Sequence, residues 1–87
     1  MPLLWIPPDL RHLTEDQGVI RVPGNTVGQA LANLETIHPG IRDHFCEGKA
    51  LNPYVTVVVD GEVSGMGLYE SLQEDSEVLF LPTMEGG

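Results

Sequence analysis

Four short apolar runs predict the strands of this chain. They occupy residues 3–6, 19–22, 54–59 and 78–81, and each ends at a proline or at an Asp-Gly pair. β-branched and large apolar side chains pack well on a pleated surface, whereas proline cannot donate a ladder hydrogen bond. Residues 8–18 read as a loop between the first two runs, so we expect these two strands to form a hairpin.

One segment has the pattern of an amphipathic helix. Thr26 and Gln29 have the capping-box spacing, in which the hydroxyl accepts an amide N–H and the glutamine side chain reaches back. The sequence His38-Pro39-Gly40 ends the helix, because proline disfavours helical geometry before it and glycine permits a turn. Apolar residues spaced three and four apart form one stripe: Val27, Ala30, Leu31, Leu34 and Ile37.

The remaining segments are shorter. Residues 41–48 predict another short helical stretch, in which Ile41 and Phe45 share a face. Asp60-Gly61 supplies the two residues with positive φ that a tight hairpin needs, and residues 62–66 return from it. Residues 68–77 are expected to be a connection with at most one helical turn.

The order of these elements predicts an α+β domain with a mixed sheet of four to five strands. One helix covers only one face of a sheet, so apolar residues on the other face are expected to be available to a partner. We expect the domain to occupy residues 1–82 and residues 83–87 to form a flexible tail.

The charge balance narrows the choice of partners. The chain has 87 residues, of which 13 are acidic and 4 basic, giving a formal net charge of −9. Such a chain is poorly suited to phosphate contacts, so we expect no nucleic-acid partner, and an anionic membrane would repel it. The charge favours a partner with a basic docking face, although it would also serve solubility alone.

The cysteine count and the hydropathy pattern bear on location. Cys46 is the single cysteine, so no internal disulfide forms and a reducing cytoplasm fits best. The N-terminal ten residues are broken by prolines and are not expected to be a secretory signal. No run approaches the roughly 20 apolar residues of a membrane span.

The chain offers little for a self-contained active site. His44 and Cys46 have no second ligand cluster, so we expect a buried cysteine and no metal site. Their spacing makes the side chains diverge on a helix, which disfavours a catalytic pair. His12 and His38 are expected at the surface. The motifs GxSxG, GxxxxGK[ST] and GxGxxG are missing, so we expect neither a bound cofactor nor an independent enzyme.

The C-terminus is the exception. The last strand leads into PTMEGG, and two terminal glycines arise by chance about once in 200 chains. With the pattern TVxxxLxxLxxxxP over residues 26–39, VxVxVxGE over 55–62 and the stretch IPPDLRHLT, the chain resembles the MoaD/ThiS-like sulfur-carrier family. That family has the ubiquitin-like β-grasp fold. The IPPDLRHLT stretch is similar to carriers of the cysteine-biosynthesis and molybdopterin types.

This resemblance implies a function for the tail. A separate E1-like adenylating enzyme would activate the carboxylate of Gly87 with ATP, and a sulfur donor would convert it to a thiocarboxylate. The sulfur would then pass to a sulfur-accepting biosynthetic enzyme. The residues implied to contact these partners are Pro82, Thr83, Met84, Glu85 and Gly86.

The tail residues suit this chemistry. Glu85 in the tail and Asp75 before the last strand depart from the family pattern. Gly86 and Gly87 lack Cβ atoms and can enter a narrow channel, and Pro82 is expected to end the strand and direct the tail. Glu85 stands where the family often has a small or apolar residue. Asp75 replaces the glycine of an Asp-Gly-Asp turn, so it must itself take any left-handed conformation.

Two other functions would use the same tail. A ubiquitin-like modifier would be joined through Gly87 to lysines of target proteins. A non-catalytic small subunit would insert its tail into a partner and would need no ATP.

Overall fold

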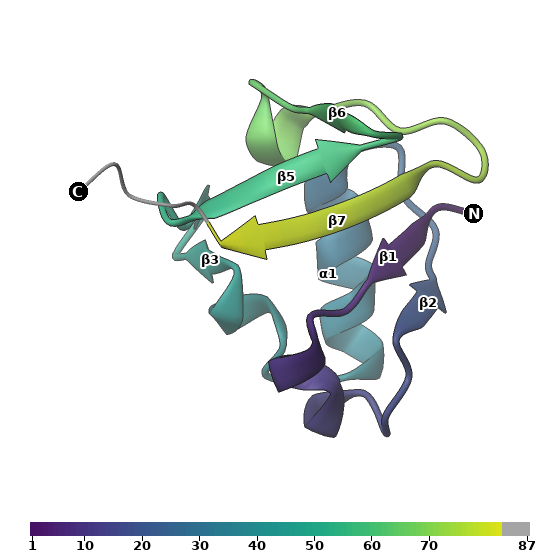
Figure 1. Ribbon diagram of the computed structural model, residues 1–87, viewed down its shortest axis with the longest axis vertical. Coiled ribbons are helices and arrows are strands. Elements are labelled where there is room, and N and C mark those ends of the chain that lie inside the picture. The colour runs from purple at the N-terminus through teal and green to yellow at the C-terminus, as the bar shows by residue number, and fades with distance from the viewer. Residues whose placement is uncertain (83–87) are drawn as a thin grey trace.

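A five-stranded mixed sheet with one helix behind it forms the body of the molecule (Figure 1). The computed structural model describes residues 1–82. The spatial order of the strands is β2-β1-β7-β5-β6, and β1 and β7 are parallel while the other pairs are antiparallel. The elements of the sheet and its helix are β1 (Leu3–Trp5), β2 (Val19–Arg21), α1 (Val27–Ile37), β5 (Val55–Val59), β6 (Glu62–Val63) and β7 (Glu77–Pro82).

Smaller elements fill the connections. Strands β3 (Cys46–Glu47) and β4 (Ala50–Leu51) form a separate two-stranded sheet. Three 3-10 turns complete the described chain, namely η1 (Pro8–Leu13), η2 (Arg42–His44) and η3 (Gly67–Tyr69). The predicted α+β class, the mixed sheet and the single main helix are confirmed, and this arrangement is the β-grasp fold.

The core lies between α1 and the inner face of the sheet. Leu4, Val57, Val78 and Phe80 point toward the helix and are at most 4% exposed. Because side chains alternate along a strand, the neighbours of these residues in sequence point to the opposite face. The predicted β1–β2 hairpin is confirmed, with Leu4 opposite Ile20.

The helix begins where its capping residues predict. The Gln29 N–H donates to Thr26 Oγ1 at 3.1 Å, while Gln29 Oε1 accepts from the Asn25 N–H at 2.8 Å, one residue before the cap. The first four residues of the predicted stripe are fully buried, but Ile37 is 54% exposed, so the prediction was wrong there. Ile37 is the last helical residue, and after the turn at Pro39-Gly40 it is Ile41 that is fully buried.

Five other predictions needed correction. The 8–18 loop contains η1, whose Leu10 is buried, and His38 is only 9% exposed and not a surface residue. In residues 41–48 only η2 is helical, because Cys46 already pairs with Leu51. The 54–59 run is only partly buried: Tyr54 lies outside β5 and is 58% exposed. Pro82 does not follow the last strand but is its final residue, opposite Val55.

Two predicted turns have the expected backbone geometry. Asp60 and Gly61 have φ angles of 51° and 86°, which confirms the tight β5–β6 hairpin. Asp75 has φ 64° and so takes the left-handed conformation itself. Within residues 1–82, no helix has both the length and the apolar character needed to cross a membrane.

Candidate functional site

An apolar row crosses the sheet on the face that α1 does not cover. Directly opposite residues on neighbouring strands point to the same face. The strand registers therefore align one residue from each strand across the whole sheet: Val63, Val58, Leu79, Trp5 and Val19. Leu81, two residues beyond Leu79 on β7, points to the same side.

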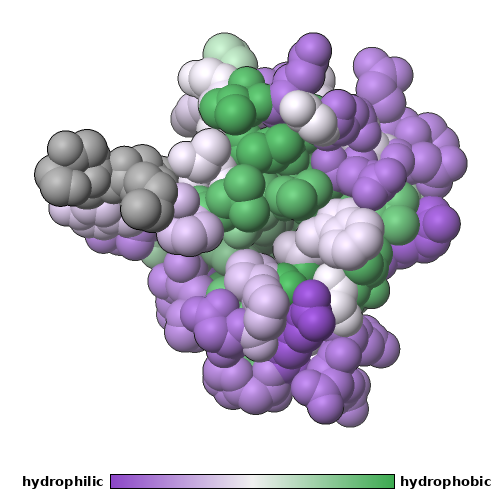
Figure 2. Space-filling model, viewed as in Figure 1, coloured by the Kyte–Doolittle hydropathy of each residue, from purple (hydrophilic) through white to green (hydrophobic). Residues whose placement is uncertain are grey.

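This face is accessible over much of its area. Trp5 is 40% exposed, Leu81 43% and Val63 73%. The view onto the sheet in Figure 2 shows apolar side chains gathered over β5 and β7, with polar residues around them. We call Trp5, Val58, Val63, Leu79 and Leu81 the outer apolar face. It is the apolar surface that the single-helix architecture leads one to expect.

Trp5 is held in a defined position on the outer apolar face. Its indole Nε1–H donates to Glu77 Oε1 at 3.0 Å, so the ring is fixed next to the first residue of β7. A large aromatic surface with one polar contact is typical of residues that dominate protein–protein interfaces.

A groove of about 180 Å³ lies at the carboxyl end of β7. Its apolar wall includes Phe45 and Phe80, whose rings stack with centroids 4.4 Å apart. Pro82, the last residue of β7, lines this groove. The end of β7 is therefore flanked by the outer apolar face and by this groove.

The predicted site residues fall at the limit of the described chain. Pro82 is exposed and belongs to β7, where it pairs with Val55. The other predicted contact residues, Thr83, Met84, Glu85 and Gly86, and the predicted reactive residue, Gly87, lie outside the described residues. Their roles remain predictions.

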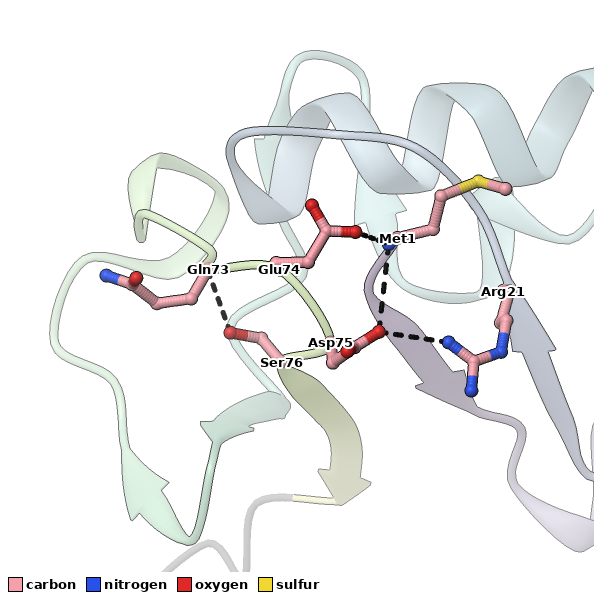
Figure 3. A network of polar contacts seen from close by, with 6 residues as sticks. All are labelled: Met1, Arg21, Gln73, Glu74, Asp75 and Ser76. Atoms are coloured by element: carbon pink, nitrogen blue, oxygen red, sulfur yellow. Dashed lines mark hydrogen bonds and ion pairs between the residues drawn. The ribbon is translucent and has the colours of Figure 1, made fainter.

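Polar contacts hold the opposite end of β7 (Figure 3). The Met1 ammonium lies 2.6 Å from Glu74 Oε1 and 3.8 Å from Asp75 Oδ1, and Arg21 Nη1 lies 3.0 Å from the same Asp75 oxygen. These groups are exposed, so each pair contributes about 0–1 kcal/mol. Together they join β1 and β2 to the turn that begins β7.

A second set of contacts ties the β5–β6 turn to the start of β7. Asp60 Oδ1 accepts from the Glu77 N–H at 2.9 Å, and Asp60 Oδ2 accepts from the Ser76 hydroxyl at 3.0 Å. Ser76 is only 1% exposed and its Oγ also accepts from the Gln73 N–H at 2.8 Å. The first residues of β7 are thus held from both sides.

The structure places the two candidate reactive side chains, His44 and Cys46, in different environments. Cys46 is buried as predicted, and its burial raises the pKa of the thiol, which makes it a poor nucleophile. His44 is exposed. No three His, Cys, Asp or Glu side chains within the described part of the chain are grouped as metal ligands.

One carboxylate has a lowered pKa for a structural reason. Glu35 accepts the backbone N–H groups of Gly40 and Arg42, each at 2.8 Å, and these two bonds lower the pKa of its carboxyl group. These two bonds join the end of α1 to the segment that follows it. They explain the lowered pKa of Glu35 by a structural role.

The sequence did not identify the members of the outer apolar face. Their alignment depends on the register between β1 and β7, and Trp5 and Leu79 are far apart in the chain. The sequence contained one usable signal for this face: side chains alternate along a strand, which places Leu79 and Leu81 on the same side of the sheet. It could not decide which face α1 covers.

Comparisons with known proteins agree with this architecture. A sequence model described as the ThiS family matches residues 5–87. A search of curated proteins returned no match.

Solved structures similar to the chain cover it almost completely. One is the BexX/CysO complex of Amycolatopsis orientalis, with 27% identity, 100% of both chains covered and a TM-score of 0.88. Another is CysO of Mycobacterium tuberculosis, with 27% identity, 97% of this chain and 100% of that chain covered, and a TM-score of 0.86. SAMP1 of Haloferax volcanii shares the fold at 24% identity, covering 99% of this chain and 98% of its own, with a TM-score of 0.77.

Proposed function

The chain belongs to the ThiS family, and we propose that it carries sulfur as a thiocarboxylate on the C-terminal Gly87. The family consists of small carrier proteins, so the chain serves as a protein co-substrate of other enzymes. The observation that carries the proposal is the position of β7: this interior strand of the β-grasp domain ends at Pro82, and the sequence reaches Gly86-Gly87 within five more residues.

The proposed chemistry begins with a partner enzyme and ATP. A carboxylate oxygen of Gly87 attacks the α-phosphorus of ATP, the bond to the β-phosphate oxygen breaks, and pyrophosphate leaves. Hydrosulfide from a sulfur donor then attacks the carbonyl carbon of the acyl-adenylate. The carbon–oxygen bond breaks, AMP leaves with the electron pair, and Gly87 ends as a thiocarboxylate.

The length of the tail makes docking of the domain necessary. Five residues follow Pro82, and five fully extended residues span at most about 17 Å. The phosphorus that Gly87 attacks must therefore lie within this distance of the end of β7. The outer apolar face adjoins that end, so we assign it to contact with the adenylating enzyme.

The charge of the chain supports the same arrangement. A net charge of −9 attracts a partner whose apolar patch is surrounded by basic residues and speeds their encounter. The acceptor is proposed to be a biosynthetic enzyme of the cysteine or molybdopterin type, or one making a related sulfur metabolite. The IPPDLRHLT stretch fits the cysteine and molybdopterin types alike, and the likeness to CysO favours the cysteine type.

An intact-mass measurement tests the proposal. The chain is incubated with an E1-like adenylating enzyme, ATP and sulfide, and we expect the mass increase of one oxygen replaced by sulfur at Gly87. A chain lacking Gly87 should fold equally well and gain no sulfur. An unchanged mass of the intact chain with all reagents present would refute the carrier function.

Two variants test the docking face within the same assay. Val63→Asp adds a charge to the outer apolar face, and we expect KM for the chain in the adenylation reaction to rise about tenfold. Ile37→Asp adds the same charge to an exposed apolar position at the end of α1 and should leave KM unchanged. Equal KM values for both variants would exclude this face from the contact.

The modifier alternative uses the same activated carboxylate. It predicts a covalent bond between Gly87 and a lysine of another protein, which the mass measurement would detect as an adduct. The small-subunit alternative predicts binding without ATP consumption.

A further inference from the structure

We propose that Lys49 is an acceptor site for Gly87 of a second copy of this chain, so that copies become joined by one defined isopeptide linkage. The inference rests on the proposed activation of Gly87, but it adds an acceptor that sulfur transfer does not need.

Lys49 is distinguished by its number and by its surroundings. It is the single lysine of the chain, and it lies exposed in the turn between β3 and β4. It makes no hydrogen bond or ion pair with any of residues 1–82, whereas each of the three arginines makes at least one. Among the lysine and arginine side chains, its ammonium is therefore the one that residues 1–82 leave unengaged.

A groove of about 280 Å³ lies directly beside Lys49. Residues 49–51 form one side of it and residues 65–69 the other. Met66 is 61% exposed and Tyr69 79% exposed, and no acidic residue lines the groove. On a chain with a net charge of −9, this combination of exposed apolar side chains and a single cation suits an apolar, anionic peptide.

The C-terminal tail of another copy has this composition. Met84 supplies an apolar, adaptable side chain for contact with Met66 and Tyr69. Glu85 supplies the negative charge that would face Lys49. The proposal thus gives a role to Glu85, which departs from the family pattern, and its position two residues before Gly87 brings the reactive carbonyl near the amine.

The joining step is an ordinary aminolysis. The lone pair of the unprotonated Lys49 Nζ attacks the carbonyl carbon of the Gly87 acyl-adenylate. The bond from that carbon to the phosphate oxygen breaks, AMP leaves with the electron pair, and the nitrogen loses a proton to water. The product contains one new amide bond and needs no oxidant or reductant.

The α-amino group of Met1 is the competing nucleophile, and it is already engaged. It is paired with Glu74 at 2.6 Å and lies 3.8 Å from Asp75 (Figure 3). The amine must leave these two partners before it can attack a carbonyl. Lys49 has no such partner among residues 1–82, so we expect it to be the preferred acceptor.

A chemically activated chain tests the acceptor without any adenylating enzyme. The full chain is released from an intein fusion as a C-terminal thioester and incubated at high concentration. We expect a dimer whose mass is that of two chains minus one thiol. Tandem mass spectrometry of its peptides should place the new bond between Lys49 and Gly87.

Three variants make the result specific. Lys49→Arg keeps the charge and should abolish the dimer. Met66→Asp places a second negative charge beside the incoming Glu85 and should slow dimer formation about tenfold. Ile37→Asp adds the same charge elsewhere and should change the rate by less than about twofold.

Three outcomes would overturn the proposal: no dimer, a bond at Met1, or equal rates for the Met66→Asp and Ile37→Asp variants. A cyclised monomer would also overturn it, because Gly87 would then reach Lys49 of its own chain. None of these outcomes bears on thiocarboxylate formation, since the thioester bypasses the enzyme. Failure of the sulfur-carrier function would appear in the ATP and sulfide assay instead.

Discussion

The carboxylate of Asp60 joins the β5–β6 turn to the strand that carries the tail, and its removal should measurably destabilise the fold. It accepts one hydrogen bond from the Ser76 hydroxyl at 3.0 Å and one from the Glu77 N–H at 2.9 Å. The backbone N–H of Asp60 donates to the Glu77 carbonyl at 2.9 Å, and a substitution leaves that bond in place.

The two lost bonds do not have equal weight. Ser76 is 1% exposed, and its hydroxyl proton is donated to Asp60 Oδ2, so removing that carboxylate takes away the acceptor of a buried donor. Leaving a buried hydroxyl unpaired costs about 1–3 kcal/mol. Glu77 is exposed, so water replaces the partner of its N–H at a cost of about 0.5 kcal/mol. We therefore expect Asp60→Gly to lower the free energy of unfolding by about 2 kcal/mol.

A second variant separates the hydrogen bonds from the backbone conformation. Asp60 has φ 51°, where alanine is disfavoured by about 1–2 kcal/mol and glycine is not. Asp60→Ala should therefore lower the free energy of unfolding by about 3–4 kcal/mol. For a domain of this size, each kcal/mol lowers Tm by about 4–8 °C.

Urea unfolding followed by the fluorescence of Trp5, the single tryptophan, measures both values. Parallel thermal scans give Tm. Equal losses for the glycine and alanine variants would show that the left-handed conformation carries no cost. An Asp60→Gly variant as stable as the parent chain would refute the assignment of the Ser76 and Glu77 bonds.

Three further predictions concern separate parts of the fold. Leu31→Ala removes a fully buried side chain of α1 and should lower the free energy of unfolding by about 2–5 kcal/mol, measured by urea titration; a smaller loss would mean that the core collapses around the site. Glu35 has its pKa lowered from an ordinary 4.5 by the Gly40 and Arg42 N–H groups, so the stability it contributes is present above pH 4.5 and lost as pH falls through the lowered value. Glu35→Gln should therefore flatten the fall in Tm below pH 4.5, and an unchanged slope would contradict this. Cys46, whose thiol pKa is raised by burial, should react with a thiol reagent only after urea is added; prompt labelling of the native chain would show that it is accessible.

Local signals in the sequence determined several features that the structure retains. The Thr26 and Gln29 cap, the stripe from Val27 to Leu34 and the Asp60-Gly61 turn depend on interactions within a few residues, so sequence spacing is sufficient to predict them. The element order and the GG ending also pointed to the family that the ThiS match supports. The proposed reactive group, Gly87, follows from the sequence alone.

Tertiary structure decided which side chains are buried and which are offered to partners. Ile37 and Tyr54 fit apolar patterns yet are exposed, while His38 is buried, because a residue's burial depends on where the chain turns relative to the core. The β3–β4 pairing likewise replaced the end of the helical stretch predicted over residues 41–48, since a strand pair depends on a second segment.

The two surfaces with proposed functions depend on contacts between distant segments. The outer apolar face exists because β1 pairs in parallel with β7, which places Trp5 beside Leu79. The groove beside Lys49 exists because the β3–β4 turn meets residues 65–69. Sequence spacing carries no information on such registers, because they are set by packing of the whole sheet against α1. The sequence alone thus pointed to the end of the chain that is proposed to react, and only the folded domain identified the surfaces proposed to bind partners.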